Sequence, residues 1–227
     1  MAWIRKNADA YARTGRSRYE TSSLERRISV RSAIVLVGGE ARRVNGMEKY
    51  FFKYLEKTFI ERLIEALQPA VDEIILVAKD EEHCERFSHL YTARCVHDIR
   101  RGIGPIGGLH AGVAASRGDQ LFVCACDMPC IDTRVVAALF EALGDYDAAI
   151  PSWDTEMLEP LHAVYRKAPL QQYLEHPPSL SLRSLVKHLN VTYVPIGQIQ
   201  AIDPDLSTFT NINKLEDLEY LGRDDPA

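Results

Sequence analysis

The sequence lacks several features that would place the protein in a familiar class. No apolar run approaches the roughly 20 residues that a membrane-spanning helix needs. The five cysteines are odd in number, include no C-x-x-C pair and are not spaced as a disulfide framework. We therefore expect no membrane association and a reducing, cytoplasmic environment.

The sequence also shows no cysteine–histidine metal motif. Cys124, Cys126 and Cys130 lie within seven positions, but no histidine lies near them. Buried thiols behave as small apolar groups, so these cysteines are expected in the core and not on zinc or an iron–sulfur cluster.

The chain has no overall excess of positive charge, but its first 31 residues have one. The net charge is −5, which does not favour nucleic-acid binding. Residues 1–31 carry eight basic and three acidic side chains, a charge of +5 that leaves −10 for the rest. This segment has no apolar core of the kind that a secretory signal contains. We expect a mobile basic arm over 1–31, followed by one α/β domain over 32–227.

Apolar runs and amphipathic segments alternate along residues 32–227. Short unalternating runs of β-branched residues predict strands that are buried on both faces. Their alternation with helical patterns predicts a doubly wound, mostly parallel sheet with helices on both faces. The expected strands are 33–37, 73–78, 92–96, 120–125, 147–151, 160–165 and 191–195, and the expected helices are 58–72, 80–89, 109–116, 133–143 and 181–189.

The segment Ala33–Lys49 joins a buried strand to a basic glycine loop. Gly38 and Gly39 end the strand, and Arg43 and Lys49 follow. Paired glycines let backbone N–H groups approach an anion, and the two cations bind oxyanions in different ways. The spacing fits neither the P-loop nor the dinucleotide motif. A solvated basic turn is the alternative.

This segment resembles the L-x-G-G-x-x-x-R-(M)-G-x-D-K loop of the NTP-transferase superfamily, and of the molybdenum cofactor guanylyltransferases in particular. The departures are Val37 for Ala, Val44 for Met and Glu48 for Asp. The matching residues are Leu36, Gly38, Gly39, Arg43, Gly46 and Lys49. The resemblance implies a Rossmann-like nucleotidyltransferase fold, with Leu36, Val37, Gly38, Gly39 and Lys49 contacting the nucleotide.

Asp127 follows the apolar run 120–125 and precedes Met128-Pro129. An acid in this position faces the crevice at the carboxyl ends of the strands. It suits Mg²⁺, which binds one or two carboxylates plus phosphate oxygens. The alternative is an acid that starts a turn or caps a helix. Cys126–Pro129 also resembles the family's C-D-x-P, whose aspartate holds the metal.

The segment 98–108 allows two interpretations. Gly102, Gly104 and Gly107 form a literal G-x-G-x-x-G, so an NAD- or FAD-binding protein is the rival hypothesis. The same stretch resembles the G-P-L-A-G loop of the guanylyltransferases, which would place Gly104, Pro105 and Gly108 beside base and ribose. Asp98 matches an acid that this family places at the nucleotide. It could equally be a loop acid paired with Arg100 or Arg101.

Two later segments also resemble the family. Residues 159–166 are similar to Q-P-L-x-A-L-Y, and within them His162 is expected to pack first and to bind a ligand second. Residues 209–218 are similar to the F-x-N-x-N-T-P-E-D-L ending. Asn213 could cap a last helix, which leaves Asn211 to reach phosphate or pterin.

The resemblance implies a Mg²⁺-dependent enzyme that transfers GMP from GTP to the terminal phosphate of molybdopterin. Arg43, Lys49 and Asp127 would carry the chemistry. A cytidylyl transferase, or an enzyme with a sugar-phosphate or phospholactate acceptor, is the nearer alternative. Expected partners are GTP, molybdopterin and, transiently, proteins of cofactor biosynthesis, with no nucleic acid and no membrane.

Overall fold

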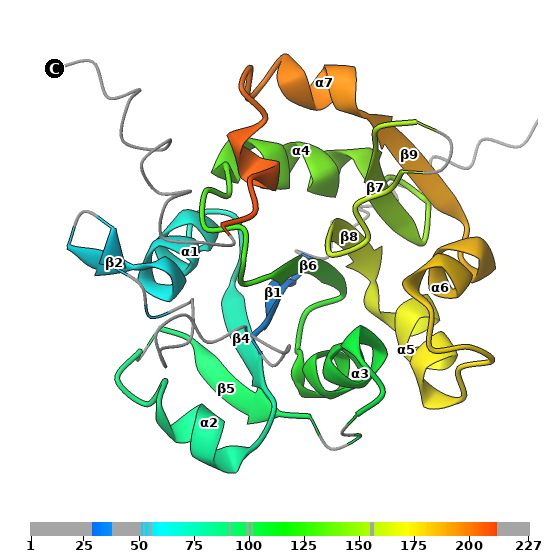
Figure 1. Ribbon diagram of the computed structural model, residues 1–227. Coiled ribbons are helices and arrows are strands. Elements are labelled where there is room, and N and C mark those ends of the chain that lie inside the picture. Colours follow the sequence, from blue (N-terminus) through cyan, green and yellow to red (C-terminus); the bar gives the residue numbers. More distant parts are fainter. Residues whose placement is uncertain are drawn as a thin grey trace, which may run out of the picture.

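A computed structural model describes residues 29–37, 51, 53–54, 56–90, 92–98, 100, 102–154 and 157–212. Its main sheet has seven strands in the order β5-β4-β1-β6-β8-β7-β9 (Figure 1). The strands are β1 (Arg31–Leu36), β4 (Glu73–Ala78), β5 (Arg94–His97), β6 (Gln120–Ala125), β7 (Ala148–Ser152), β8 (His162–Arg166) and β9 (Val191–Pro195). A separate pair consists of β2 (Lys53–Tyr54) and β3 (Lys57–Thr58).

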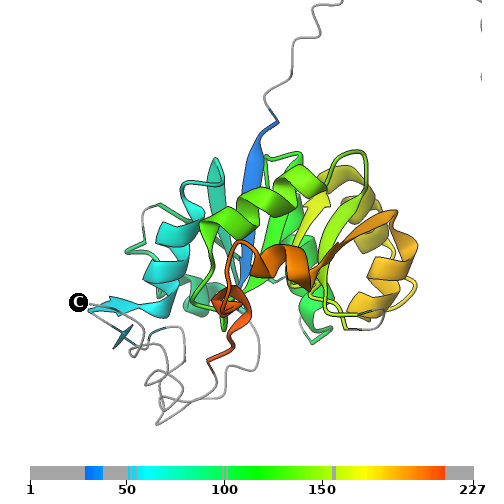
Figure 2. The ribbon, with the colours of Figure 1, turned by 90° about the horizontal axis from the view of Figure 1, so that it is seen from above.

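Only β8 runs against its neighbours, pairing antiparallel with β6 and β7, so the predicted mostly parallel sheet is confirmed. Helices cover both faces (Figures 1 and 2). The helices are α1 (Phe59–Leu67), α2 (Glu81–Glu85), α3 (Pro105–Ala115), α4 (Thr133–Ala142), α5 (Lys167–Glu175), α6 (Leu182–His188) and α7 (Ile196–Gln200), with a 3-10 turn at Ser207–Phe209. None of the described helices is long and apolar enough to cross a bilayer.

The two faces of the sheet have separate cores. Side chains of α1, α4 and α7 pack with one face of β1, as in the contact set of Leu63, Leu139 and Val35. Side chains of α3, α5 and α6 pack with the opposite face, in a cluster that includes Ile34, Leu109 and Leu185. Alternate residues of β1 thus face different cores, which explains why its sequence is apolar without alternation.

Local signals account for the start of α1. Thr58 caps this helix by accepting from the Glu61 backbone N–H at 3.3 Å, and the Glu61 carboxylate accepts from the Thr58 N–H at 2.7 Å. This reciprocal capping box fixes the helix at the predicted residue. The hydrogen bonds from Thr58 hold the pKa of Glu61 below its usual value.

Helix α3 begins four residues earlier than the sequence predicted. Pro105 occupies its first turn, where the missing N–H costs nothing, and Gly104 precedes it with φ +69°. Two glycines within the helix, Gly108 and Gly112, bring it close to the sheet. A Cβ added at Gly112 would lie 2.5 Å from Ile34 Cγ2, and one at Gly108 would lie 3.2 Å from Leu36 Cδ2.

The structure contains a disulfide, although the cysteines are not spaced as a disulfide framework and a reducing environment was expected. Cys84 of α2 and Cys95 of β5 are bonded, with their Cα atoms 5.6 Å apart. Their proximity depends on the packing of α2 beside β5, which residue spacing does not reveal. Cys124 is buried in the core as expected, and burial raises the pKa of its thiol.

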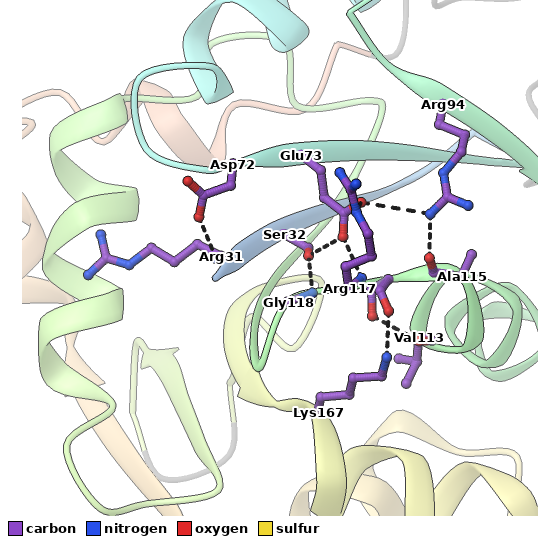
Figure 3. Close-up of polar contacts among 11 residues, drawn as sticks. Arg31, Ser32, Asp72, Glu73, Arg94, Val113, Ala115, Arg117, Gly118 and Lys167 are labelled. Atoms are coloured by element: carbon purple, nitrogen blue, oxygen red, sulfur yellow. Dashed lines mark hydrogen bonds and ion pairs between the residues drawn. The ribbon is translucent and has the colours of Figure 1, made fainter. Parts of the chain in front are cut away.

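A polar cluster closes the edge of the sheet where the parallel strands begin (Figure 3). Ser32 donates to Glu73 Oε1 at 2.7 Å and accepts from the Gly118 N–H at 2.9 Å. Arg117 pairs with Glu73 Oε2 at 3.0 Å, and Arg94 approaches the same oxygen to 3.7 Å. Burial would raise the pKa of Glu73, but the hydrogen bonds from Arg117 and Ser32 outweigh it and lower this pKa. The polar groups at this edge are therefore paired with one another. The opposite edge, at the carboxyl ends of the strands, is the place to look for a ligand site.

Candidate active site

The carboxyl ends of four neighbouring strands bring the predicted residues to one edge. Backbone bonds extend the sheet just past β1, β4 and β5: the Val37 N–H donates to Val77 O at 3.0 Å, and the Asp98 N–H donates to Ala78 O at 2.9 Å. The Cys126 N–H donates to Leu36 O at 3.2 Å. Val37, Asp98 and Asp127 therefore lie on the same edge, where ligands bind in open α/β sheets.

Asp127 is the second residue after the central strand β6 and is half-buried. Its carbonyl oxygen accepts from the Ile212 N–H at 3.0 Å, which brings the exposed Asn211 beside it. Among the described residues, no group of three or more His, Cys, Asp or Glu side chains could hold a metal by itself. A single carboxylate on an open edge fits Mg²⁺, whose other oxygens come from substrate phosphates and water.

Asp98 is held in place by the backbone that follows it. Its Oδ1 accepts from the Arg100 N–H at 2.7 Å, while the Arg100 side chain donates to Leu174 O at 3.0 Å and to Glu175 O at 3.3 Å. The Arg100 side chain therefore caps the end of α5 and does not neutralise Asp98. Arg101, the other partner considered for Asp98, lies outside the described residues.

The three glycines of the G-x-G-x-x-G stretch have structural roles. Gly102 and Gly104 have φ +82° and +69°, a conformation that other residues rarely adopt. A Cβ at Gly107 would lie 2.6 Å from Asp98 Oδ2 and 2.8 Å from Arg100 O. The third glycine thus allows the first turn of α3 to pack against Asp98. Gly104 and Pro105, both exposed, begin that turn.

Leu36 and Val37 differ in what they can offer a ligand. Leu36 is half-buried and packs against Gly108, whereas the Val37 side chain is fully buried in the core. Val37 can therefore meet a nucleotide only through its backbone. The predicted residues Gly38, Gly39, Arg43, Lys49 and Asn213 lie outside the described residues.

His162 packs in the core, which is the first of the two roles expected for it. Its ring lies edge-on to Phe122 at 5.2 Å between centroids and 4.8 Å from Phe209. Thr208 Oγ1 lies within hydrogen-bond distance of His162 Nε2, at 3.2 Å, and also accepts from the Asp132 N–H. Complete burial lowers the pKa of His162 to about 3, which keeps the imidazole neutral.

Two residues at this edge were missed by the sequence reasoning. Trp153 follows β7 directly, and its indole N–H donates to Glu159 Oε1 at 2.8 Å. The usable signal was a tryptophan in a polar stretch immediately after a buried strand, followed by an acid before Pro160.

A pocket of about 400 Å³ opens nearby, between α1 and the chain after Asp127. Phe59, Arg62, Pro129 and Cys130 are among its described lining residues, and none of the predicted site residues is. The strand ends therefore define the candidate site better than this pocket does.

A sheet with this strand order and an acid after its central strand has the architecture of a nucleotidyltransferase. Residues 33–192 match the model of the MobA-like NTP transferase domain, and the chain belongs to this family.

Relatives over almost the whole chain agree with this assignment. A probable molybdenum cofactor guanylyltransferase of Methanosarcina mazei is 40% identical over 211 residues, which are 89% of this chain and 94% of that protein. One from Peptoclostridium acidaminophilum is 37% identical, covering 85% and 88%. The crystal structure of molybdopterin-guanine dinucleotide biosynthesis protein A from Archaeoglobus fulgidus matches with a TM-score of 0.68, 32% identity, and coverage of 83% and 95%. These relatives favour the transferase over the NAD- or FAD-binding alternative.

Proposed function

We propose that the protein transfers GMP from GTP to the terminal phosphate of molybdopterin and releases pyrophosphate. The observation that carries this proposal is the shared edge of Val37, Asp98 and Asp127, with Gly38 and Gly39 following Val37 in the sequence. Relatives named as molybdenum cofactor guanylyltransferases support the choice of guanine and pterin.

The reaction needs positioning and charge neutralisation more than proton transfer. An ionised oxygen of the acceptor phosphate forms a bond to the α-phosphorus of GTP, and the bond to the oxygen bridging α and β breaks. No general base is required, because the nucleophile is already an anion. The neutral, enclosed His162 accordingly has no role as a base. Catalysis then rests on holding the two anions in line and offsetting their charge.

The proposed residues divide the work of binding and charge neutralisation among them. Asp127 would hold Mg²⁺, which supplies positive charge at the phosphates. Arg43 and Lys49 would offset charge on the leaving pyrophosphate, and the Gly38 and Gly39 N–H groups would donate to phosphate oxygens. Asp98 would accept from guanine N1–H and its exocyclic amine.

Two further tasks follow from the resemblance to the family. Gly104, Pro105 and Gly108 would border the base and ribose, and Asn211 and Asn213 would reach phosphate or pterin. We place the reaction in the cytoplasm, where GTP is made and used.

Ligand-dependent melting tests the proposed function. A ligand at 100 times its dissociation constant stabilises by about 2.7 kcal/mol, an easily measured shift. We expect a shift with GTP and Mg²⁺, little with ATP and none with NAD. The variant Gly39→Val should lose the GTP shift, because its side chain would occupy the phosphate position. An NAD shift that survives Gly39→Val and disappears in Gly104→Val would contradict the proposal.

A further inference from the structure

The exposed Trp153 lies at the same edge of the sheet as Asp127. β7 runs parallel to β6, because both pair antiparallel with β8 between them. Trp153 is the first residue after β7, and Asp127 is the second residue after β6. Two strand spacings, roughly 10 Å, therefore separate these two positions along the edge.

The indole of Trp153 is fixed although it is not buried. Its N–H donates to Glu159 Oε1 at 2.8 Å, and its ring lies edge-on to Phe209 with centroids 5.7 Å apart. The backbone is fixed as well, because the Trp153 N–H donates to Met157 O at 2.9 Å. Even so, 39% of Trp153 and 58% of Met157 remain exposed. An oriented aromatic surface with satisfied polar atoms suits the stacking of a planar ring.

The Glu159 carboxylate has unused capacity beside this ring. Only Oε1 is bonded to the indole, and within the described part of the chain Oε2 accepts no hydrogen bond. A carboxylate offers about four acceptor positions, so it can receive two adjacent N–H donors from one ligand.

The Trp153 position is coupled to Asp127 through the end of the described chain. Phe209 packs on both Trp153 and the buried His162. Three residues later, Ile212 donates to the carbonyl oxygen of Asp127. Along the edge, Asp98 thus lies on the β5 side of Asp127 and Trp153 lies on the β7 side, as the strand order requires. If guanine lies at Asp98, the β7 side remains for the acceptor.

We propose that Trp153 and Glu159 form the subsite for the pterin ring of the acceptor, with Trp153 stacking on the ring and Glu159 accepting from its pyrimidine edge. A pterin is planar and presents a ring N–H next to an exocyclic amine, two donors that match one carboxylate. Its phosphate arm then extends toward Asp127. This inference rests on the proposed function only for the identity of the acceptor.

Tryptophan fluorescence tests the subsite without any turnover. The chain has two tryptophans, Trp3 and Trp153, so Trp3→Phe leaves Trp153 as the sole reporter. We expect saturable quenching by neopterin monophosphate, a phosphorylated pterin, and none by ribose phosphate. Glu159→Gln, introduced into the Trp3→Phe variant, should weaken the affinity for neopterin monophosphate. Quenching that is absent, or that does not saturate, overturns the subsite.

Kinetics separate the subsite from the proposed function as a whole. Trp153→Ala should raise the KM for the molybdopterin acceptor by about tenfold or more, since base–aromatic stacking has effects of this size. The KM for GTP should stay the same, and Trp153→Phe should restore most of the acceptor affinity. The control is Tyr146→Ala, an aromatic that is 42% exposed at the opposite end of β7.

The outcomes are distinct. An unchanged acceptor KM in a well-folded Trp153→Ala, while GTP still shifts the melting temperature, overturns the subsite and leaves guanylyl transfer standing. If the unmodified protein does not bind GTP, the proposed function is overturned. The quenching experiment then still decides the subsite.

Discussion

The Ile212 N–H donates to the Asp127 carbonyl oxygen at 3.0 Å, which joins the last described residues to the end of the central strand. The bond uses only backbone atoms of Asp127, so its carboxylate remains available at the edge of the sheet. Asn211, which immediately precedes Ile212, is exposed. Changes to the Asp127 side chain should therefore affect catalysis without loosening this connection.

The first prediction concerns Asp127→Asn. This substitution keeps the size and the backbone bond but removes the charge that Mg²⁺ requires. We expect a melting temperature close to that of the parent and a transfer rate lower by about 10² or more. Rates measured across a Mg²⁺ titration check this. Near-normal turnover at saturating Mg²⁺ would rule out Asp127 as the metal ligand.

The second prediction concerns Gly107. A methyl group there would lie 2.6 Å from Asp98 Oδ2 and 2.8 Å from the Arg100 carbonyl, so Asp98 must move. Gly107→Ala should raise the KM for GTP with a smaller effect on kcat. Gly197→Ala in α7 is the matched control, because a Cβ there meets nothing within 4 Å. Equal GTP kinetics in the two variants would show that Asp98 does not contact the nucleotide.

Sequence periodicity was most informative where residues act locally. The strands Glu73–Ala78 and Gln120–Ala125 have the predicted bounds because their apolar runs are uninterrupted. The cap at Thr58 was likewise visible in the sequence. Helix α5 (Lys167–Glu175) was missed because Pro169 interrupts the pattern, although proline is tolerated in a first helical turn.

Contacts between distant segments were not predictable from the same patterns. The sequence placed Asp98 and Asp127 at strand ends, but it could not show that Arg100 caps α5 or that Trp153 meets Glu159. Both contacts depend on how the strands are ordered and on where loops return. The Cys84–Cys95 bond depends on tertiary placement in the same way.

The third prediction is a pH dependence of stability from His162. Its pKa is about 3 in the folded protein and about 6.5 when the chain is unfolded. The unfolded state therefore takes up this proton first as the pH falls. The free energy of unfolding should decrease from about pH 6.5 toward about pH 3, by up to about 1.4 kcal/mol per pH unit.

Denaturant unfolding of variants at several pH values measures the contribution of His162. His162→Gln cannot titrate and should show a smaller slope than the parent, whatever its absolute stability. His176→Gln, at an exposed histidine, is the matched control variant. Identical slopes for His162→Gln and the parent would contradict the assignment.

The fourth prediction concerns the bond between Cys84 and Cys95, which are 11 residues apart in sequence. Closing a loop of this length should stabilise the fold by about 2–3 kcal/mol. The double variant Cys84→Ser and Cys95→Ser should be less stable by this amount and insensitive to reductant. Thiol titration of the denatured, unreduced protein should find three free cysteines, Cys124, Cys126 and Cys130. Five titratable thiols would show that the bond does not form.

The central claim is guanylyl transfer to molybdopterin. Its most direct test measures pyrophosphate release with each nucleoside triphosphate in combination with molybdopterin, a sugar phosphate or phospholactate. With Mg²⁺ present, we expect release with GTP and molybdopterin, formation of the guanine dinucleotide, and strong loss of both in Asp127→Asn and Lys49→Ala. Preferential turnover of CTP, or transfer to a sugar phosphate or phospholactate in place of molybdopterin, would contradict guanylyl transfer to the cofactor.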